Sequence, residues 1–291
     1  MPAEKPSLAD LRREIDRIDD ALHDLLMQRA ELTAGIAASK PGGSGTVRPA
    51  REAAILRRLV ARHKGPFPRA IVARIWREII SANTALQGPF SVAVLANREH
   101  DALFQTARAF YGQMTPILHF ETPSSVLRAV GDGSATLGLL PLPAIDAKEA
   151  WWRLIARHGE NVPRVIARVP FAPGEAPSVE GLAVSLGPNE PSGRDRSLLV
   201  VETAQELSRS TLRKQMGDAG LTVVEMQSWE GPGQHLTLTE VEGFFAADSP
   251  EVANLEADEA IAQVVAIGAY ALPLTPAELA GEKAPLSQVE P

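Results

Sequence analysis

Two basic side chains interrupt an apolar stripe near the N-terminus of the chain. The stripe repeats at spacings of three and four residues, the pattern of a helix that packs along its length against another helix. Its members are Leu11, Ile15, Ile18, Leu22, Leu25, Arg29, Leu32, Ile36 and Lys40. Burying a cation without a counter-charge costs on the order of several kcal/mol. Arg29 and Lys40 therefore indicate that this helical seam encloses an anion.

Other polar residues are placed to line the same groove. Arg29 and Lys40 differ by only about 20° around the helix, so both project the same way. Arg12 lies about 100° away from Arg29 and is expected to reach the groove of a second copy. The remaining candidates are Arg51 and Glu52, which open a second helix, and Asn83 and Gln87, which share a face of a third. This set suits a small dicarboxylate with a hydroxyl group, and it needs neither a metal nor another cofactor.

Three helices must position these side chains. Ser7 and Asp10 predict the N-cap of a first helix that ends near Ser39 and is about 50 Å long. Two shorter helices are expected at about 49–63 and 68–87. Their predicted core residues are Ile55, Leu56, Leu59, Val72, Ile75, Ile79 and Ile80. One subunit with these lengths cannot cover the long stripe, so we expect an intertwined dimer; the alternative is a monomeric bundle with a protruding helix.

After this helical module, residues 1–88, the pattern changes to alternating strands and helices. Residues 90–187 are expected to form an α/β lobe that begins with a βαβαβ order. Strands are predicted at about 91–96, 116–120, 135–142, 164–171 and 181–186, and helices at about 100–110, 124–130 and 147–158.

The C-terminal segment, residues 195–275, has a βαββαβ order, which is the ferredoxin-like plan. Strands are predicted at about 197–202, 221–228, 235–245 and 266–272, and helices at about 205–219 and 252–265. Residues 276–291 are expected to be a flexible tail. The predicted fold class is therefore multidomain: an all-α module, an α/β lobe and a ferredoxin-like α+β domain.

Composition limits the classes of function. The 291 residues carry a net charge of −7, which argues against a general nucleic-acid binder. The charge is uneven, because residues 1–90 hold 15 basic and 10 acidic residues and so attract small anions. The chain has no Cys, which excludes disulfides and thiolate metal sites. No apolar run is long enough to span a membrane, and a cytoplasmic location is expected.

Four sequence runs resemble the all-helical, AroQ-type chorismate mutases. The runs are Leu11-Arg12-Arg13-Glu14-Ile15-Asp16, Leu26-Met27-Gln28-Arg29-Ala30-Glu31-Leu32, Arg48-Pro49-Ala50-Arg51-Glu52 and Glu78-Ile79-Ile80-Ser81-Ala82-Asn83. They occur in the family's order over about residues 7–88. The resemblance implies an intertwined homodimer that converts chorismate, a dianion, into prephenate during aromatic amino-acid biosynthesis.

The resemblance also implies which residues bind the ether oxygen and the two carboxylates of the substrate. No covalent step is needed, because the enzyme holds a compact conformer and stabilises the charge that grows on the ether oxygen. By family analogy Lys40 and Gln87 face that oxygen. Arg29 and the Arg12 of a second copy grip the two carboxylates, where the planar fork of Arg is superior to Lys.

The same analogy assigns the remaining candidates. Glu52 holds the ring hydroxyl, and Arg51 orients the substrate and its neighbours. Asn83 occupies a position often filled by Ser in the family. Arg48 stands where some relatives carry an acidic residue, so an additional hydroxyl contact is not expected there.

The rest of the chain resembles bifunctional chorismate mutase–prephenate dehydratases that end in an ACT regulatory domain. The run Gly138-Leu139-Leu140-Pro141-Leu142-Pro143 looks like the dehydratase strand, but the family's Glu-Asn-Ser is replaced here by Ala144-Ile145-Asp146. The family's Thr-Arg-Phe motif is missing, and Pro163-Arg164-Val165 lies roughly where it is expected. The region is also short for two lobes. We therefore expect a dehydratase-like remnant without dehydratase activity.

The ACT-like unit implies an amino-acid effector, commonly phenylalanine in this family. The family's Gly-Ala-Leu and Glu-Ser-Arg-Pro motifs are replaced by Glu206-Leu207-Ser208 and Glu225-Met226-Gln227-Ser228. Two alternatives to a chorismate mutase remain open from the sequence. One is a bifunctional enzyme with a divergent dehydratase site, and the other is a non-catalytic protein that senses chorismate.

Overall fold

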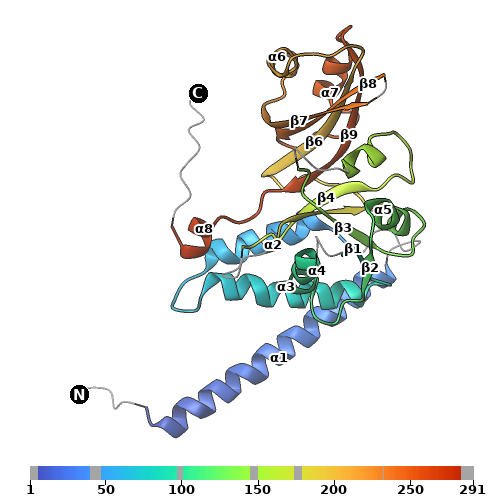
Figure 1. Ribbon diagram of the computed structural model, residues 1–291. Helices are drawn as coiled ribbons and strands as arrows, with labels where there is room; N and C mark the ends of the chain where they lie inside the picture. Colours follow the sequence, from blue (N-terminus) through green and yellow to red (C-terminus); the bar gives the residue numbers. More distant parts are fainter. Residues whose placement is uncertain are drawn as a thin grey trace.

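The computed structural model describes residues 6–39, 47–96, 101–144, 150–173, 179–231 and 233–282. A module of three helices leads into a mixed sheet of nine strands (Figure 1). The helices of the module are α1 (Leu8–Ala38), α2 (Pro49–Arg62) and α3 (Arg69–Ala85). Their bounds agree with the three helices predicted from the sequence to within a few residues.

Helix α1 begins at the predicted cap. The Ser7 hydroxyl accepts a hydrogen bond from the Asp10 backbone N–H at 3.2 Å, and the Asp10 carboxylate accepts one from the Ser7 backbone N–H at 3.1 Å. This reciprocal capping box satisfies two donors that have no partner inside the helix.

The apolar stripe of α1 is exposed in the single chain. None of the 31 residues of α1 is buried. The exposed stripe residues are Leu11, Ile15, Ile18, Leu22, Leu25, Leu32 and Ile36, each 46% to 72% exposed. A long helix with an uncovered apolar face gains too little from local interactions to be stable alone in water. Helix α1 therefore needs a partner surface.

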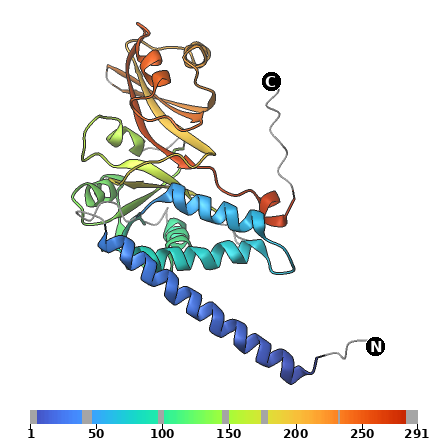
Figure 2. The same ribbon diagram turned by 180° about the vertical axis from the view of Figure 1, so that it is seen from behind.

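Helices α2 and α3 form a hairpin that packs directly against the rest of the chain (Figure 2). Leu56 of α2 and Ala73 of α3 belong to the same apolar core as the first strands of the sheet. Of the other predicted core residues, Ile80 is buried and Ile75 is 43% exposed. The prediction for Ile75 is wrong within one chain, because α3 turns the face that carries Ala73 and Ile80 inward and Ile75 away.

The α/β lobe has the predicted βαβαβ order. Its elements are β1 (Val92–Leu95), α4 (Asp101–Tyr111), β2 (Ile117–Phe120), α5 (Pro123–Gly131) and β3 (Leu137–Pro141). Strand β1 pairs in parallel with both β2 and β3. Strands β5 (Gly181–Ser185) and β4 (Arg164–Val169) extend this sheet in antiparallel fashion.

One helix predicted in the lobe is wrong in length. Instead of a helix at 147–158, the described residues form the short 3₁₀ helix η2 (Trp151–Ile155), and residues 145–149 lie outside the described ranges. Both Trp151 and Trp152 are buried, and the Trp151 indole N–H donates to the Pro141 carbonyl at 3.0 Å. Packing of these indoles against the sheet overrides the local helical pattern.

The C-terminal unit has the predicted βαββαβ order. Its elements are β6 (Asp195–Thr203), α6 (Arg209–Asp218), β7 (Val223–Gly231), β8 (Gln234–Glu242), α7 (Pro250–Glu256) and β9 (Ile261–Ala271). The strands lie in the order β9-β6-β8-β7 with antiparallel neighbours, as in ferredoxin-like folds.

The predicted helix at 252–265 ends earlier than expected. Helix α7 stops at Glu256, and residues 261–265 already belong to β9. Val264 and Val265 pair with the central residues of β6. Their β-branched side chains fit this buried pleated surface better than a helix, so the tertiary pairing decides the boundary.

The α/β lobe and the ferredoxin-like unit share one continuous sheet. The order is β2-β1-β3-β5-β4-β9-β6-β8-β7, and the two halves meet where β4 lies parallel to β9. The pairing at this junction is Val165 with Gly268. The two predicted units are therefore joined by strand pairing as well as by residues 187–194.

We expect Gly268→Ala to break this junction. Gly268 has φ +138°, and an added Cβ would lie 2.1 Å from the Val165 carbonyl oxygen. Strain and steric clash together predict a loss of about 3 kcal/mol or more of unfolding free energy. Urea denaturation measures this loss, and Gly217→Ala, at an exposed helical position with open space around the Cβ, is the control. Equal stability of the two variants would contradict the proposed close approach.

The segment after residue 275 starts with structure rather than with a flexible tail. Thr275 and Glu278 form a capping box for α8 (Pro276–Ala280), and Arg194 donates to the Glu278 carboxylate at 2.9 Å. Helix α8 packs against α2 and α3. Residues 283–291 lie outside the described ranges.

Candidate functional site

Four of the predicted site residues, Arg51, Glu52, Asn83 and Gln87, lie at one end of the helical module. The C-terminal ends of α1 and α3 and the N-terminal end of α2 lie together, next to the α/β lobe (Figures 1 and 2). Helix α3 contacts both α1 and α2. The chain therefore gathers Asn83 and Gln87 at the same end as Arg51 and Glu52, and the helix that carries Arg29 runs into this end.

Among the candidate site residues, Arg29 has a buried hydrogen-bond donor that lacks an acceptor in the described part of the chain. Its side chain is half-buried, and Nη1 is buried without a hydrogen-bond partner in the part of the chain that the structure describes. Burial lowers the pKa of Arg29 from its ordinary value. A desolvated guanidinium with an unused donor is a strong binding group for a carboxylate.

Two amides lie on consecutive turns at the end of α3. Asn83 is buried, and its side-chain N–H₂ donates to the Ile79 carbonyl at 2.7 Å. The Asn83 Oδ1 atom is buried and has no partner among the described residues. Gln87 is half-buried, and its N–H₂ donates to the Asn83 carbonyl at 3.3 Å, a long bond that a better acceptor can replace.

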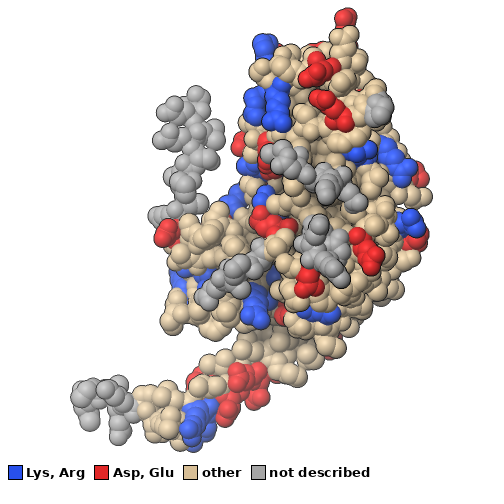
Figure 3. All heavy atoms as spheres, viewed as in Figure 1, with Lys and Arg blue, Asp and Glu red and all other residues tan. Residues whose placement is uncertain are grey.

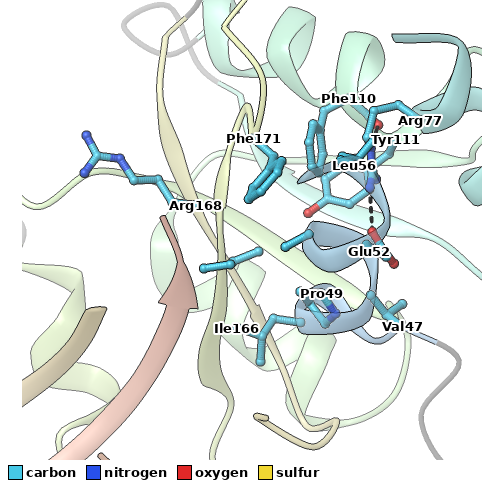
Figure 4. A pocket seen from close by; sticks show the side chains of 13 residues that line it. Val47, Pro49, Glu52, Leu56, Arg77, Phe110, Tyr111, Ile166, Arg168 and Phe171 are labelled. Carbon is cyan, nitrogen blue, oxygen red and sulfur yellow. Dashed lines mark hydrogen bonds and ion pairs between the residues drawn. The ribbon is translucent and has the colours of Figure 1, made fainter. Parts of the chain in front are cut away.

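The first turn of α2 places its two charged residues differently. Arg51 is exposed to solvent. The Glu52 carboxylate instead forms a buried ion pair with Arg77 of α3, 2.5 Å from Oε2 to Nη1 (Figure 4). Our sequence analysis missed Arg77. The signal was present, because Arg77 lies on the same inward face of α3 as Ala73 and Ile80, an unusual position for an unpaired cation.

Arg12 lies far from the other candidates within one chain. It is exposed near the start of α1, about 26 Å from Arg29 along a straight helix. Lys40 lies outside the described residues, so its predicted position in the groove stays a prediction. Arg12 therefore does not join the other candidates within one chain, and its supply by a second chain stays a prediction.

Three other features of the described residues bear on function: the surface charge (Figure 3), the grouping of metal-ligating side chains, and the length and hydropathy of the helices. On the face shown in Figure 3, acidic and basic side chains of the described residues are interspersed rather than gathered in a broad basic area. Within the described ranges, no three His, Asp or Glu side chains are grouped to hold a metal ion. Nor is any described helix both long and apolar enough to cross a bilayer.

The position where we expected a dehydratase motif has a structural role. The Arg164 guanidinium donates to the carbonyls of Ile155 and Arg157, each at 2.7 Å. Burial lowers the pKa of Arg164. Both hydrogen bonds stabilise the turn after η2, so the Arg164 guanidinium is used in contacts within the lobe. Ile145 and Asp146, which replace part of the family's Glu-Asn-Ser, lie outside the described residues.

Comparison with known proteins shows what the helical module is similar to. The family model described as chorismate mutase type II matches residues 11–88. The bifunctional chorismate mutase/prephenate dehydratase of Pseudomonas aeruginosa is 32% identical over 148 residues, which cover 48% of this chain and 40% of that protein. The bifunctional enzyme of Neisseria gonorrhoeae is 42% identical over 85 residues, 29% of this chain and 23% of that protein. The chain thus matches less than half the length of these relatives.

The solved structures that resemble this chain are distant. The prephenate dehydratase from Streptococcus mutans aligns with a TM-score of 0.45 and 13% sequence identity, and the alignment covers 63% of this chain and 98% of that chain. A similarity of this size assigns no activity to the α/β lobe. The family match confirms the resemblance that the four sequence runs carry.

Proposed function

We propose that the chain is an enzyme that rearranges chorismate to prephenate, because residues 11–88 match the family model described as chorismate mutase type II. The observation that carries the proposal is the half-buried Arg29 guanidinium, whose buried Nη1 has no partner among the described residues. A desolvated cation of this kind costs stability in the single chain, and a bound carboxylate would offset that cost. Chorismate is a dianion.

The proposed mechanism uses position and charge alone. The groove holds the compact conformer in which the two bond-forming carbons meet. Negative charge grows on the ether oxygen as the C–O bond breaks, and Lys40 and Gln87 donate to that oxygen. A donor in such a position contributes about 2.7–4 kcal/mol if it is comparable to an oxyanion-hole donor. Preferential stabilisation of the developing charge favours turnover over plain binding.

The other candidates bind the groups that do not react. We assign Arg29 and the Arg12 of a second copy to the two carboxylates, because a guanidinium fork binds a carboxylate through two parallel bonds. Glu52 accepts a hydrogen bond from the ring hydroxyl, Arg51 orients the substrate, and Asn83 supports the far side of the groove with its unused Oδ1.

A homodimer is part of the proposal. The exposed stripe of α1 would pack against the stripe of a second copy, and this intertwining would bring the second Arg12 to the groove. The 26 Å estimate between Arg12 and Arg29 supports the second chain as the source, since a side chain reaches only about 7 Å from its helix axis.

The proposal also covers the regions that follow the helical module. We propose a mutase domain over 1–88, a dehydratase-like lobe without activity over 90–187 and an ACT-like domain over 195–275. Arg164 supports an inactive lobe, because it is engaged by backbone carbonyls. A second candidate, the bifunctional enzyme, is favoured by the 148-residue match to the Pseudomonas enzyme, which extends beyond the mutase domain.

One assay separates these proposals. The purified chain is incubated with chorismate, and the products are identified before any acid step, with and without L-phenylalanine. We expect prephenate alone, formed at a rate that L-phenylalanine changes if the ACT-like domain binds an effector. Phenylpyruvate would establish the bifunctional enzyme. Chorismate that binds but remains unchanged would show a sensor and would contradict the proposed activity.

A further inference from the structure

The helical module and the α/β lobe meet at a polar contact inside an apolar interface. The walls come from α2, α3, α4 and strand β4 (Figure 4). The cavity between them has a volume of about 20 Å³. That is room for about one water molecule, so it is not a second substrate site. The charged pair Glu52–Arg77 lines this cavity, and its presence in an apolar interface calls for a function.

Arg77 makes three interactions, one with Glu52 inside the helical module and two with Phe110 of the lobe. Its Nη1 donates to Glu52 Oε2 at 2.5 Å, and its Nε donates to the Phe110 backbone carbonyl at 3.1 Å. The guanidinium also lies over the Phe110 ring, 3.8 Å from the ring centroid. Phe110 belongs to α4 of the lobe. The lobe therefore fixes the plane of the guanidinium, and the guanidinium fixes one carboxylate oxygen of Glu52.

Both partners are shielded from water. The Arg77 side chain is 7% exposed and that of Glu52 is 15% exposed. A pair at this depth is screened little by salt, and its geometry is held by the packing around it. Lys cannot replace this arginine, because a single ammonium cannot serve the carboxylate and the carbonyl while stacking on the ring.

We propose that Arg77 is a positioning residue of the mutase site, which it serves by holding Glu52 against the α/β lobe. The inference rests on the proposed function, since it takes Glu52 as the group that binds the substrate hydroxyl. With Oε2 held by Arg77, the Oε1 atom is left to accept that hydrogen bond. The lobe then has a role without any dehydratase chemistry: it is a structural part of the mutase site.

The charge of Arg77 matters as well as its geometry. Glu52 would otherwise place a bare carboxylate beside a substrate that carries two negative charges. Like charges at a few ångströms repel strongly where water is scarce. Arg77 neutralises Glu52, so the site gains a hydroxyl acceptor while keeping its affinity for a dianion.

A double-mutant cycle between Arg77→Met and Glu52→Gln tests the proposal. We expect Arg77→Met to lower kcat/KM by about 10- to 100-fold, mainly through KM, the size of a lost charge-assisted hydrogen bond. Because Arg77 acts through Glu52, the double variant should fall within about 3-fold of Glu52→Gln alone rather than multiply the two losses. Multiplicative losses would overturn the proposal, as would a wild-type kcat/KM in the Arg77→Met variant.

Two further variants separate positioning from folding. Arg108→Met changes an arginine of α4 in the lobe, whose guanidinium donates to the carbonyls of Gln113 and Thr115 and not to Glu52. It should leave kcat/KM within about 2-fold of wild type, although it removes two hydrogen bonds from the lobe. If Arg77→Met fails to fold, Arg77→Lys replaces it in the cycle, with the same coupling expected.

Failure of the proposed function would be distinguishable from failure of this inference. A wild-type chain that does not convert chorismate contradicts the proposed function. The cycle is then run on the dissociation constant for chorismate measured by calorimetry, and coupling between Arg77 and Glu52 in that constant still supports the positioning role. Additive effects on the dissociation constant would overturn it.

Discussion

Arg29→Met should lower kcat/KM for chorismate by about 100- to 1,000-fold while leaving the folded chain as stable as wild type or more stable. The loss of activity corresponds to about 2.7–4 kcal/mol of transition-state stabilisation, the range for one preorganised donor to a developing or fixed anion. The stability follows from the environment of the guanidinium. The Arg29 Nη1 atom is buried without a partner among the described residues, and burial lowers the pKa of Arg29. Desolvation of this guanidinium therefore lowers the stability of the single chain, and no hydrogen bond to Nη1 from the described residues offsets the loss.

A large loss of kcat/KM without a loss of stability distinguishes a residue that binds substrate from one that holds the fold. Met keeps the apolar stem of the side chain and removes only the charge. Steady-state kinetics with chorismate and urea denaturation of the same preparation measure the two effects. Arg17→Met, which removes an exposed arginine paired with Glu14 on α1, is the matched control and should change neither quantity appreciably. A marked loss of stability in Arg29→Met would show that Arg29 holds the fold and would remove the main support for the proposed function.

Leu25→Glu should abolish both the dimer and the activity. Leu25 is 61% exposed in the single chain and lies in the middle of the α1 stripe. If two stripes pack together, the substitution buries two carboxylates close to the two-fold axis, and each costs on the order of several kcal/mol. A dissociated chain lacks the Arg12 of its partner, so turnover is lost with the dimer.

The control for this substitution is on the same helix. Met27→Glu introduces the same charge about 200° around α1 from Leu25, on a face that carries no stripe residue, and is expected to keep the dimer and the activity. Sedimentation velocity gives the oligomeric state and the chorismate assay gives the rate. A monomeric wild-type chain with full activity would rule out the intertwined dimer.

Mixing two inactive variants adds an independent check on the shared site. A chain with Arg12→Met and a chain with Arg29→Met would each form defective homodimers. In a mixed dimer, one groove receives the intact Arg29 of one chain and the intact Arg12 of the other. Full exchange at equal concentrations should therefore restore about a quarter of the wild-type activity, because half of the dimers are mixed and each has one intact groove. No recovery after exchange would place all site residues within one chain.

The inferred role of Arg77 gives a physical reason for a lobe whose expected dehydratase motifs are replaced. Val47, Leu56 and Phe110 belong to the same apolar core, so the mutase helices and the lobe are buried against each other. Removal of the lobe would expose that surface and free the guanidinium that holds Glu52. Under the proposal for Arg77, the mutase site requires the lobe whether or not the lobe has dehydratase activity.

The sequence alone was enough to predict the three helices of the module, whereas the role of its site residues stays a prediction. The capping box at Ser7, the spacing of the α1 stripe and the two cations within it are local patterns, and local patterns are set by helical geometry. The strand–helix orders of both C-terminal units follow from alternation and periodicity in the same way. These features need no knowledge of distant contacts.

The tertiary structure decided what depends on contacts between distant residues. The end of α7 and the start of β9 were set by the pairing of Val264 with β6, which overrides the local helical pattern. The ion pair between Glu52 and Arg77 joins residues 25 positions apart and depends on the angle at which α3 meets α2 and α4. Sequence spacing fixes positions around one helix axis, but the distance between two helices depends on the side chains packed between them, and only the folded chain specifies that packing.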